Sequence, residues 1–388
     1  MSTPQPLEGT RILSLEQFGA GPYGTMFLAQ LGAEVIKIEN PGVGGDPARY
    51  TGPYLLGDAD SQYFQSWNLN KRSVTLDIKS ESGRAAFLSL VLDADAVVNN
   101  LRGDLPGALG LDYAALSRTK ASIVCLHISA YGRDGARAAW PGYDYLMQAE
   151  SGLMSLTGEP DGPPSRFGAP SLIDHMTGMT AMVGLLAALL QARSSGRGCD
   201  VDLNLLDVAL HQLGYAATWY LNEGLRTTRQ PRSAHFSVAP AQTLATQDGW
   251  IFVMCMTEKF WTALIGAIGR PDLQADPRFE NVRARHEHRA ELTEVLDREL
   301  SRQPTRYWLA KFAGLLPAAP VLDVATALSS EFVAESGMVQ HLEHPHKADL
   351  RVLSNPLKID GRRPVAKVCS ALGADSSELL GYPAHDSG

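Results

Sequence analysis

Short apolar segments alternate with helix-like segments over residues 11–128, and this alternation limits the fold more than any other feature of the chain. The segments expected to be strands are 11–15, 34–39, 73–78, 96–99 and 122–128, and those expected to be helices are 25–31, 83–92 and 113–117. A parallel connection between two strands needs a crossover, which is usually a helix. We therefore predict an α/β fold with an open, mostly parallel, Rossmann-like sheet that helices cover on both faces.

The pattern changes near residue 225, where a second domain is expected to begin. Residues 242–246 and 250–254 are predicted to form a β-hairpin, and helices are expected at 260–268, 287–300 and 305–313. A chain of 388 residues is also longer than one typical domain of about 100–200 residues. We expect a large α/β domain over 1–224, a smaller α+β domain over 225–330, and a C-terminal segment over 331–388 that returns to the large domain.

The composition argues against several classes of protein. The chain has 34 Lys+Arg against 42 Asp+Glu, a net charge of −8, whereas a protein that binds nucleic acid needs a basic face. Its 4 cysteines include no CxxC pair, which is typical of a reduced cytoplasmic protein. The longest apolar stretch, 182–190, is shorter than the ~20 residues of a membrane span, and no signal sequence is evident. The histidine-rich segments 286–288 and 341–346 lack metal-ligand spacing, so no nucleic acid, membrane or metal is expected.

A glycine-rich segment, Gly19-Ala-Gly-Pro-Tyr-Gly24, follows the first expected strand and matches the GxGxxG pattern. In dinucleotide-binding proteins such glycines let a pyrophosphate approach the backbone, and an acid after the second strand, here Glu39, binds the ribose. A plain strand–turn–helix explains the segment too, because Pro22 suits the first position of a helix, where its missing N–H costs nothing. An NAD-dependent oxidoreductase therefore stays open at this point.

Asp174 is expected to begin the strongest helix of the chain, over 174–191. An aspartate there is commonly an N-cap with a purely structural role. It also lies at the positive end of the helix dipole, where a carboxylate stays ionised and developing negative charge is stabilised. His175 follows it and is either a general base or a packing residue. Four cations near the ends of strands are candidate phosphate ligands or ordinary solvated side chains: Lys71, Arg72, Lys79 and Arg102.

Several segments together resemble the family III CoA-transferases, which include formyl-CoA transferase, carnitine CoA-transferase and α-methylacyl-CoA racemase. The similar segments are 20–22, 31–39, 70–73, 76–79, 142–148, 152–164, 177–178, 276–279 and 317–321, and Asp174 lies at the helix start as in that family. The resemblance covers most of the chain and accounts for the glycine-rich segment without NAD. It implies a homodimer whose two chains thread through each other like links.

The resemblance implies that Asp174 attacks an acyl-CoA thioester to form an aspartyl anhydride. The released CoA then forms an aspartyl-CoA thioester, and a free organic acid accepts the CoA. CoA and acyl-CoA are substrates in this scheme, no cofactor is tightly bound, and the other partner is a small carboxylic acid, with dicarboxylic acids among the candidates. The positions that correspond to coenzyme contacts are Gly19, Ala20, Leu76, Lys79, Asn100, Leu101, Arg102 and, beside the acyl group, Tyr143.

The chain departs from the family pattern at several positions. Asn40 and Ala108 stand where formyl-CoA transferase has basic residues near the nucleotide phosphates. Gly19 replaces a glutamine near the reacting centre. No glycine-rich loop is evident near 254–257, which argues against formate or oxalate as the substrate acid.

One departure bears on the type of reaction. The racemase has Gly-His-Asp where this chain has Gly142-Tyr143-Asp144, and a tyrosine with a pKa near ~10 is a poor base at neutral pH. A CoA-transferase is therefore favoured over an acyl-CoA racemase, which would use Asp174 with His175 or Tyr143 to move an α-proton.

Overall fold

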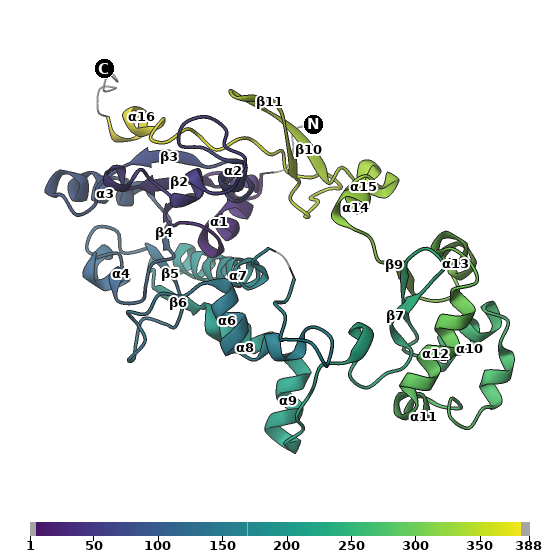
Figure 1. The fold of residues 1–388 in the computed structure, drawn as a ribbon. Helices are drawn as coiled ribbons and strands as arrows, with labels where there is room; N and C mark the ends of the chain where they lie inside the picture. The colour runs from purple at the N-terminus through teal and green to yellow at the C-terminus, as the bar shows by residue number, and fades with distance from the viewer. Residues whose placement is uncertain (1–4, 169, 382–388) are drawn as a thin grey trace. The chain divides into compact units, whose positions relative to one another are not determined.

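The computed structural model describes residues 5–168 and 170–381. The chain divides into two compact units (Figure 1). Unit 1 comprises Met1–Ser151, Gly168–Gln212 and Glu331–Gly388, and unit 2 comprises Gly152–Phe167 and Leu213–Ser330. As separately folding domains, the ranges 1–224, 225–330 and 331–388 stay a prediction.

Unit 1 is built around a six-stranded parallel sheet with the order β3-β2-β1-β4-β5-β6. The strands are β1 (Arg11–Leu15), β2 (Glu34–Glu39), β3 (Arg72–Thr75), β4 (Ala96–Asn99), β5 (Val124–Ser129) and β6 (Asp200–Asn204). This confirms the predicted parallel α/β sheet. The strand order reverses between β1 and β4, so the carboxyl ends of these strands border the crevice where open α/β sheets bind ligands.

The predicted bounds differ from the observed ones where side chains cap a turn. β3 ends at Thr75 rather than at residue 78, because Asp77 accepts a hydrogen bond from the N–H of Lys79 and so forms a turn. Ser80 then caps α3 (Glu81–Asp93). The other described helices of unit 1 are α1 (Ala20–Gln30), α2 (Gln62–Asn68), α4 (Leu105–Ala108), α5 (Tyr113–Leu116), α6 (Asp144–Glu150), α7 (Leu172–Ser195), α8 (Leu205–His211), α15 (Glu331–Ser336) and α16 (Ser376–Leu380). The C-terminal segment adds the antiparallel hairpin of β10 (Val339–His344) and β11 (Lys347–Leu353).

Helix α7 is the central helix of unit 1. Over the described residues it is the one helix long and apolar enough to cross a membrane, judged by length and composition alone. It packs against α1, β5 and β6 (Figure 1). The apolar stretch is therefore longer than the predicted 182–190, and its inner side belongs to the core of unit 1.

The glycine-rich segment 19–24 explains how closely α1 and α7 approach each other. A Cβ atom on Gly24 would lie 2.7 Å from the carbonyl oxygen of Gly178, and one on Gly178 would lie 2.5 Å from the carbonyl oxygen of Ala20. No larger residue fits either position without moving a helix. The last glycine of the GxGxxG pattern therefore serves helix packing.

Unit 2 contains a three-stranded antiparallel sheet with the order β7-β8-β9. β7 (Ala241–Ala245) and β8 (Trp250–Met254) form the predicted hairpin, and β9 (Ala318–Pro320) pairs with β8. Its helices are α9 (Gly214–Glu223), α10 (Glu258–Ala267), α11 (Val282–Glu287), α12 (Arg289–Leu300), α13 (Thr305–Phe312) and α14 (Val324–Leu328). Trp261, Phe279, Trp308 and Phe312 are buried in its apolar core.

Candidate active site

Asp174 is the third residue of α7 and lies in its first turn. The helix begins at Leu172, after Ser171 at the N-cap position. The prediction that Asp174 begins and caps the helix is therefore wrong. Asp174 instead lines a pocket of about 310 Å³ in unit 1, and it is only partly exposed.

The structure brings the predicted site residues together in one region of unit 1. Leu76 and Lys79 line a second cavity of about 240 Å³, which shares Gln17, Leu101 and Leu105 with the pocket of Asp174. The pocket residues come from the loops that follow β1 and β4, from the segment that leads into α6, and from the first turn of α7. The predicted residues in the pocket are Gly19, Ala20, Asn100, Leu101, Arg102, Tyr143 and Asp174.

Asp144 holds the backbone of Asp174. Its carboxylate is buried, and its Oδ2 atom accepts a hydrogen bond from the backbone N–H of Asp174 at 3.0 Å. The other oxygen accepts a hydrogen bond from the Nε2 atom of Gln148 at 2.5 Å. Asp144 therefore anchors the first turn of α7 to α6.

Burial raises the pKa of Asp174 to about 7, and the nearby charge of Asp144 adds to this effect. Over the described residues, no group donates a hydrogen bond to the Asp174 carboxylate. The sequence-based expectation that the helix N-terminus keeps this carboxylate ionised is therefore opposed by desolvation and by a second acid. The result is a poorly solvated carboxylate that titrates near neutral pH.

Gly19 provides the space that the Asp174 carboxylate occupies. A Cβ atom on Gly19 would lie 2.3 Å from the Oδ2 atom of Asp174, which is far inside van der Waals contact. Gly21 is similarly confined, since a Cβ atom there would lie 3.0 Å from Glu16 and 3.2 Å from Asn100. Gly19 therefore shapes the wall of the carboxylate pocket, and Gly21 lets α1 pack closely against Glu16 and Asn100.

The residue expected to bind a ribose in an NAD site is already engaged. The Oε1 atom of Glu39 accepts hydrogen bonds from Arg49 and from Ser73, each at 2.7 Å. Its Oε2 atom accepts from Arg49 at 2.8 Å and from the backbone N–H of Asp46 at 3.0 Å. The NAD interpretation needs a free acid after the second strand and glycines that face a pyrophosphate. Glu39 is already paired and the glycines are in close contact with protein atoms, so neither requirement is met.

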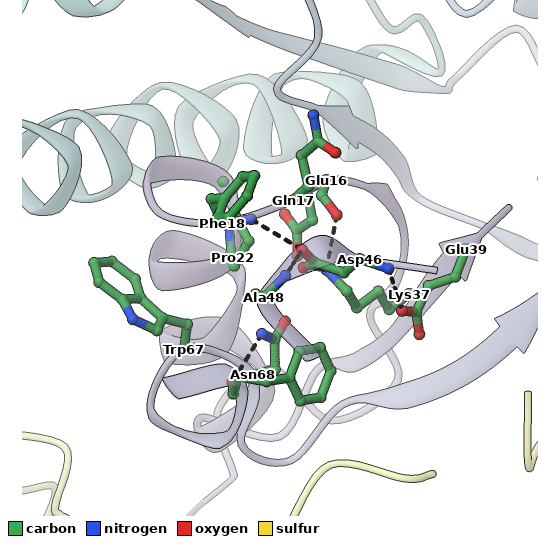
Figure 2. Close-up of polar contacts among 12 residues, drawn as sticks. Glu16, Gln17, Phe18, Pro22, Lys37, Glu39, Asp46, Ala48, Trp67 and Asn68 are labelled. Atoms are coloured by element: carbon green, nitrogen blue, oxygen red, sulfur yellow. Dashed lines mark hydrogen bonds and ion pairs between the residues drawn. The ribbon is translucent and has the colours of Figure 1, made fainter. Parts of the chain in front are cut away.

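Buried ion pairs support the loop after β1 from behind. Lys71 pairs with Glu16 at 2.8 Å, and Lys37 pairs with Asp46 at 2.9 Å, with all four side chains inaccessible to solvent. Asp46 also accepts a hydrogen bond from the backbone N–H of Phe18, whose φ is +58° (Figure 2). The pairs therefore hold the turn that leads to Gly19. Sequence reasoning missed them, although a lysine between isoleucines in a strand covered on both faces was a signal.

Two of the four cations near strand ends are not free to bind a phosphate. Lys71 is buried, and burial lowers its pKa to about 8 although Glu16 opposes this change. Arg72 pairs with Glu34, Asp375 and Glu378. The interpretations of Lys71 and Arg72 as phosphate ligands or solvated side chains are therefore wrong.

The other two cations line the cavities. Lys79 is the cation among the described residues that line the second cavity, and its side chain is exposed. Arg102 lines the pocket of Asp174 and pairs with Asp104 at 3.1 Å on the surface.

His175 points away from the pocket and packs against aromatic side chains. Its ring stacks on Tyr23 with 4.2 Å between centroids, and it lies 4.9 Å from the ring of Trp67. Burial lowers the pKa of His175, so the ring is neutral near pH 7. The stacking supports the packing role of His175, which is not among the described residues that line the pocket of Asp174.

A parallel sheet with a pocket at its switch point is the arrangement in which α/β enzymes bind their ligands. The chain matches the model of CoA-transferase family III over residues 7–376, and it belongs to that family. It is therefore a CoA-transferase of family III, as its sequence predicted.

Curated relatives are similar over most of their length. The chain is 35% identical to the acetyl-CoA:oxalate CoA-transferase of Acetobacter aceti, over 92% of this chain and 90% of that protein. It is 33% identical to the succinyl-CoA:glutarate CoA-transferase of Homo sapiens, over 89% of this chain and 78% of that protein. A CAIB/BAIF family protein from Brucella suis has a similar solved structure, with a TM-score of 0.85, 30% identity, and coverage of 98% of this chain and 99% of that chain.

Proposed function

We propose that this protein moves CoA from an acyl-CoA to a free dicarboxylic acid, with Asp174 as the nucleophile. The observation that carries the proposal is the Asp174 carboxylate, which lines a pocket at the sheet switch point with no hydrogen-bond donor to it among the described residues. Relatives named for oxalate and glutarate support a dicarboxylic acid as the acceptor. Oxalate therefore stays among the acids to be tested, although the segment 254–257 lacks the expected glycine-rich loop.

The proposed reaction has four steps in which a carboxylate and a thiolate exchange acyl groups. The Asp174 carboxylate attacks the thioester carbonyl carbon, the C–S bond breaks, and CoA thiolate leaves an aspartyl anhydride. The thiolate then attacks the aspartyl carbonyl carbon and releases the donor acid, which leaves an aspartyl-CoA thioester. The acceptor carboxylate attacks that thioester, the C–S bond breaks, and CoA thiolate leaves a second anhydride between the acceptor and Asp174. The thiolate finally attacks the acceptor's acyl carbon, which forms the new acyl-CoA and releases the Asp174 carboxylate. One thioester is consumed and one is formed, so no other energy source is needed.

The site suits a carboxylate nucleophile for two reasons. A carboxylate in water is strongly solvated and reacts poorly, whereas one with few hydrogen bonds is more reactive. The pKa of Asp174 near 7 still leaves a large fraction ionised at neutral pH. In addition, Asp174 lies in the first turn of α7, at the positive end of the helix dipole, which stabilises the negative charge of a tetrahedral intermediate.

We propose that the coenzyme extends across the two adjoining cavities. The nucleotide end would lie in the cavity of Leu76 and Lys79, where the Lys79 ammonium is the available cation. The thioester end would lie beside Gly19 and Tyr143 in the pocket of Asp174. The remaining predicted contacts, Ala20, Asn100, Leu101 and Arg102, line the route between these ends.

The experiment that tests the function is a screen of free acids against succinyl-CoA and acetyl-CoA, with products identified by mass spectrometry. Glutarate, oxalate, succinate and a monocarboxylic acid of equal length are the informative acceptors. Asp174→Asn is expected to fold and to lose transfer by several orders of magnitude, because Asp174 is the one carboxylate among the described residues that line the pocket. Hydroxylamine added during turnover should modify the peptide that contains Asp174. A fully active Asp174→Asn, or a label elsewhere, contradicts the proposal.

The same samples separate the racemase alternative. A racemase exchanges the α-proton of its acyl-CoA with solvent deuterium in the absence of any acceptor acid, whereas the proposed transferase does not. His175 supports the transferase, because its ring stacks on Tyr23 and it does not line the pocket of Asp174.

A further inference from the structure

Unit 2 contains a cavity of about 380 Å³ that shares no residue with the pocket of Asp174. Its volume lies within the range of ~300–1,000 Å³ that is typical of small-molecule sites. Two of its walls are aromatic, Trp219 from α9 and Phe236 from the segment before β7. Tyr215 joins these walls, because its ring lies 4.6 Å from that of Trp219 and 6.1 Å from that of Phe236. The cavity therefore offers an apolar surface for the body of a ligand.

Two donors in the lining have no partner of their own. The hydroxyl oxygen of Thr227 is buried and makes no hydrogen bond to any described residue. Arg226 also lines the cavity, and its guanidinium forms no hydrogen bond or ion pair within the described part of the chain. A buried hydroxyl is normally paired, and an arginine is a planar donor that suits a carboxylate. The Arg226 guanidinium is therefore available to a ligand, whereas the Thr227 hydroxyl is too deeply buried to face the cavity.

His286 adds a second available donor, and its tautomer is determined by a neighbour. The guanidinium of Arg289, which has donors only, lies 2.8 Å from the Nδ1 atom of His286. Nδ1 must therefore accept, which places the ring proton on Nε2. Burial and the charge of Arg289 lower the pKa of His286, so this neutral form persists at pH 7. His286 lines the cavity as an N–H donor.

The charges around the cavity select the class of ligand. One arginine and one neutral donor, His286, suit a single carboxylate. A nucleotide with several phosphates is disfavoured, because only one cation is present among the lining residues and Glu223 contributes a negative charge. We infer that this cavity is a second binding site, in which a small organic acid lies between Trp219 and Phe236 and pairs its carboxylate with Arg226. This inference does not depend on the role of Asp174.

Hydrogen–deuterium exchange of the full-length protein with glutarate tests the site. Glutarate is expected to slow exchange in the peptide 219–237 and in α11, whereas uncharged glutaramide is not. Arg226→Gln should need at least about tenfold more glutarate for the same protection. This is the loss of affinity expected for one charge-assisted hydrogen bond. The matched control Arg283→Gln, on an exposed arginine of α11 paired with Glu287, should leave the protection unchanged.

Transfer measured at saturating substrates should be equal in wild type and Arg226→Gln, because Arg226 lies outside the pocket of Asp174. If neither protein catalyses transfer but glutarate still protects the peptide 219–237, the proposed function is wrong and the second binding site stands. The inference is overturned by absence of protection in 219–237, by equal protection in Arg226→Gln, or by equal protection from glutaramide. Protection by inorganic phosphate but not by glutarate would also overturn it.

Discussion

Replacing Asp174 by asparagine is expected to stabilise the protein at high pH even as it abolishes transfer. An aspartate has an ordinary pKa of 3.8, and burial together with Asp144 raises the pKa of Asp174 to about 7. Since one pKa unit corresponds to about 1.4 kcal/mol, ionising this group costs the folded state at most about 4 kcal/mol. The pocket is open to water, which screens the charge, so we expect about half of this value, ~2 kcal/mol.

The direction of the effect follows from the raised pKa. The folded protein holds the proton of Asp174 more tightly than the unfolded chain does. This contribution to stability is fully present below pH 3.8 and is lost as the pH rises through about 7. Asparagine has no such proton, so the advantage of Asp174→Asn over the wild type should grow between these two pH values.

Urea denaturation of both proteins at about pH 5 and about pH 8 measures this advantage directly. The matched control is Asp134→Asn, an exposed position outside the pocket, which should show no pH-dependent difference from the wild type. A constant free-energy difference for Asp174→Asn across the range would refute the desolvated carboxylate. It would also be refuted if the free energy of unfolding of the wild type rose relative to that of Asp174→Asn as the pH rises.

Four further outcomes are expected. Asp144→Asn should shift the rise of kcat/KM with pH to lower pH, because it removes the negative charge that helps to raise the pKa of Asp174. An unchanged pH dependence of kcat/KM would mean that Asp144 only positions the backbone of Asp174. Lys71→Met should lower the free energy of unfolding by about 3–5 kcal/mol, since it leaves Glu16 buried and unpaired. Lys79→Met, at an exposed position, should change the free energy of unfolding little, and similar losses in both variants would contradict the buried pair. Gly19→Ala should keep the fold by circular dichroism and lose most of kcat, because the added Cβ displaces the carboxylate; normal turnover would show that the site tolerates that displacement. If the chains interlink in a homodimer, labelled native chains should not exchange partners unless they are first unfolded, and exchange within minutes would exclude interlinking.

Five strands of the unit 1 sheet were predictable because most of their residues are buried. Strand β6 was not predicted, and its residues are partly buried or exposed. The segment Glu34–Glu39 is short and rich in β-branched residues, and helical spacing precedes it. Its type is therefore readable from local sequence. The ends of elements were less predictable, because they depend on single side chains. Ser171, not Asp174, occupies the N-cap position of α7, and Asp77 ends the segment after β3.

The electrostatics of the site depend on contacts between distant parts of the chain. Asp144 and Asp174 are 30 positions apart, and no local pattern shows that the carboxylate of one accepts from the backbone of the other. A lone aspartate at a helix N-terminus is expected to be ionised, and only the burial created by neighbouring segments reverses that expectation. The pKa of Asp174 was therefore out of reach of sequence reasoning.

The buried ion pairs and the glycine-rich segment together explain why the loop after β1 has its shape. Phe18 has a left-handed backbone conformation, which is unfavourable for a residue with a side chain and persists only where the surroundings require it. Asp46 stabilises this conformation by accepting a hydrogen bond from the N–H of Phe18. Lys37 forms an ion pair with Asp46 and also donates a hydrogen bond to the carbonyl oxygen of Glu16. The turn then brings Gly19, which has no side chain, against the Asp174 carboxylate. A turn with no side chain at its tip leaves the carboxylate facing the pocket. Loss of one partner from a buried pair behind the turn would leave an unpaired buried charge, which is strongly destabilising.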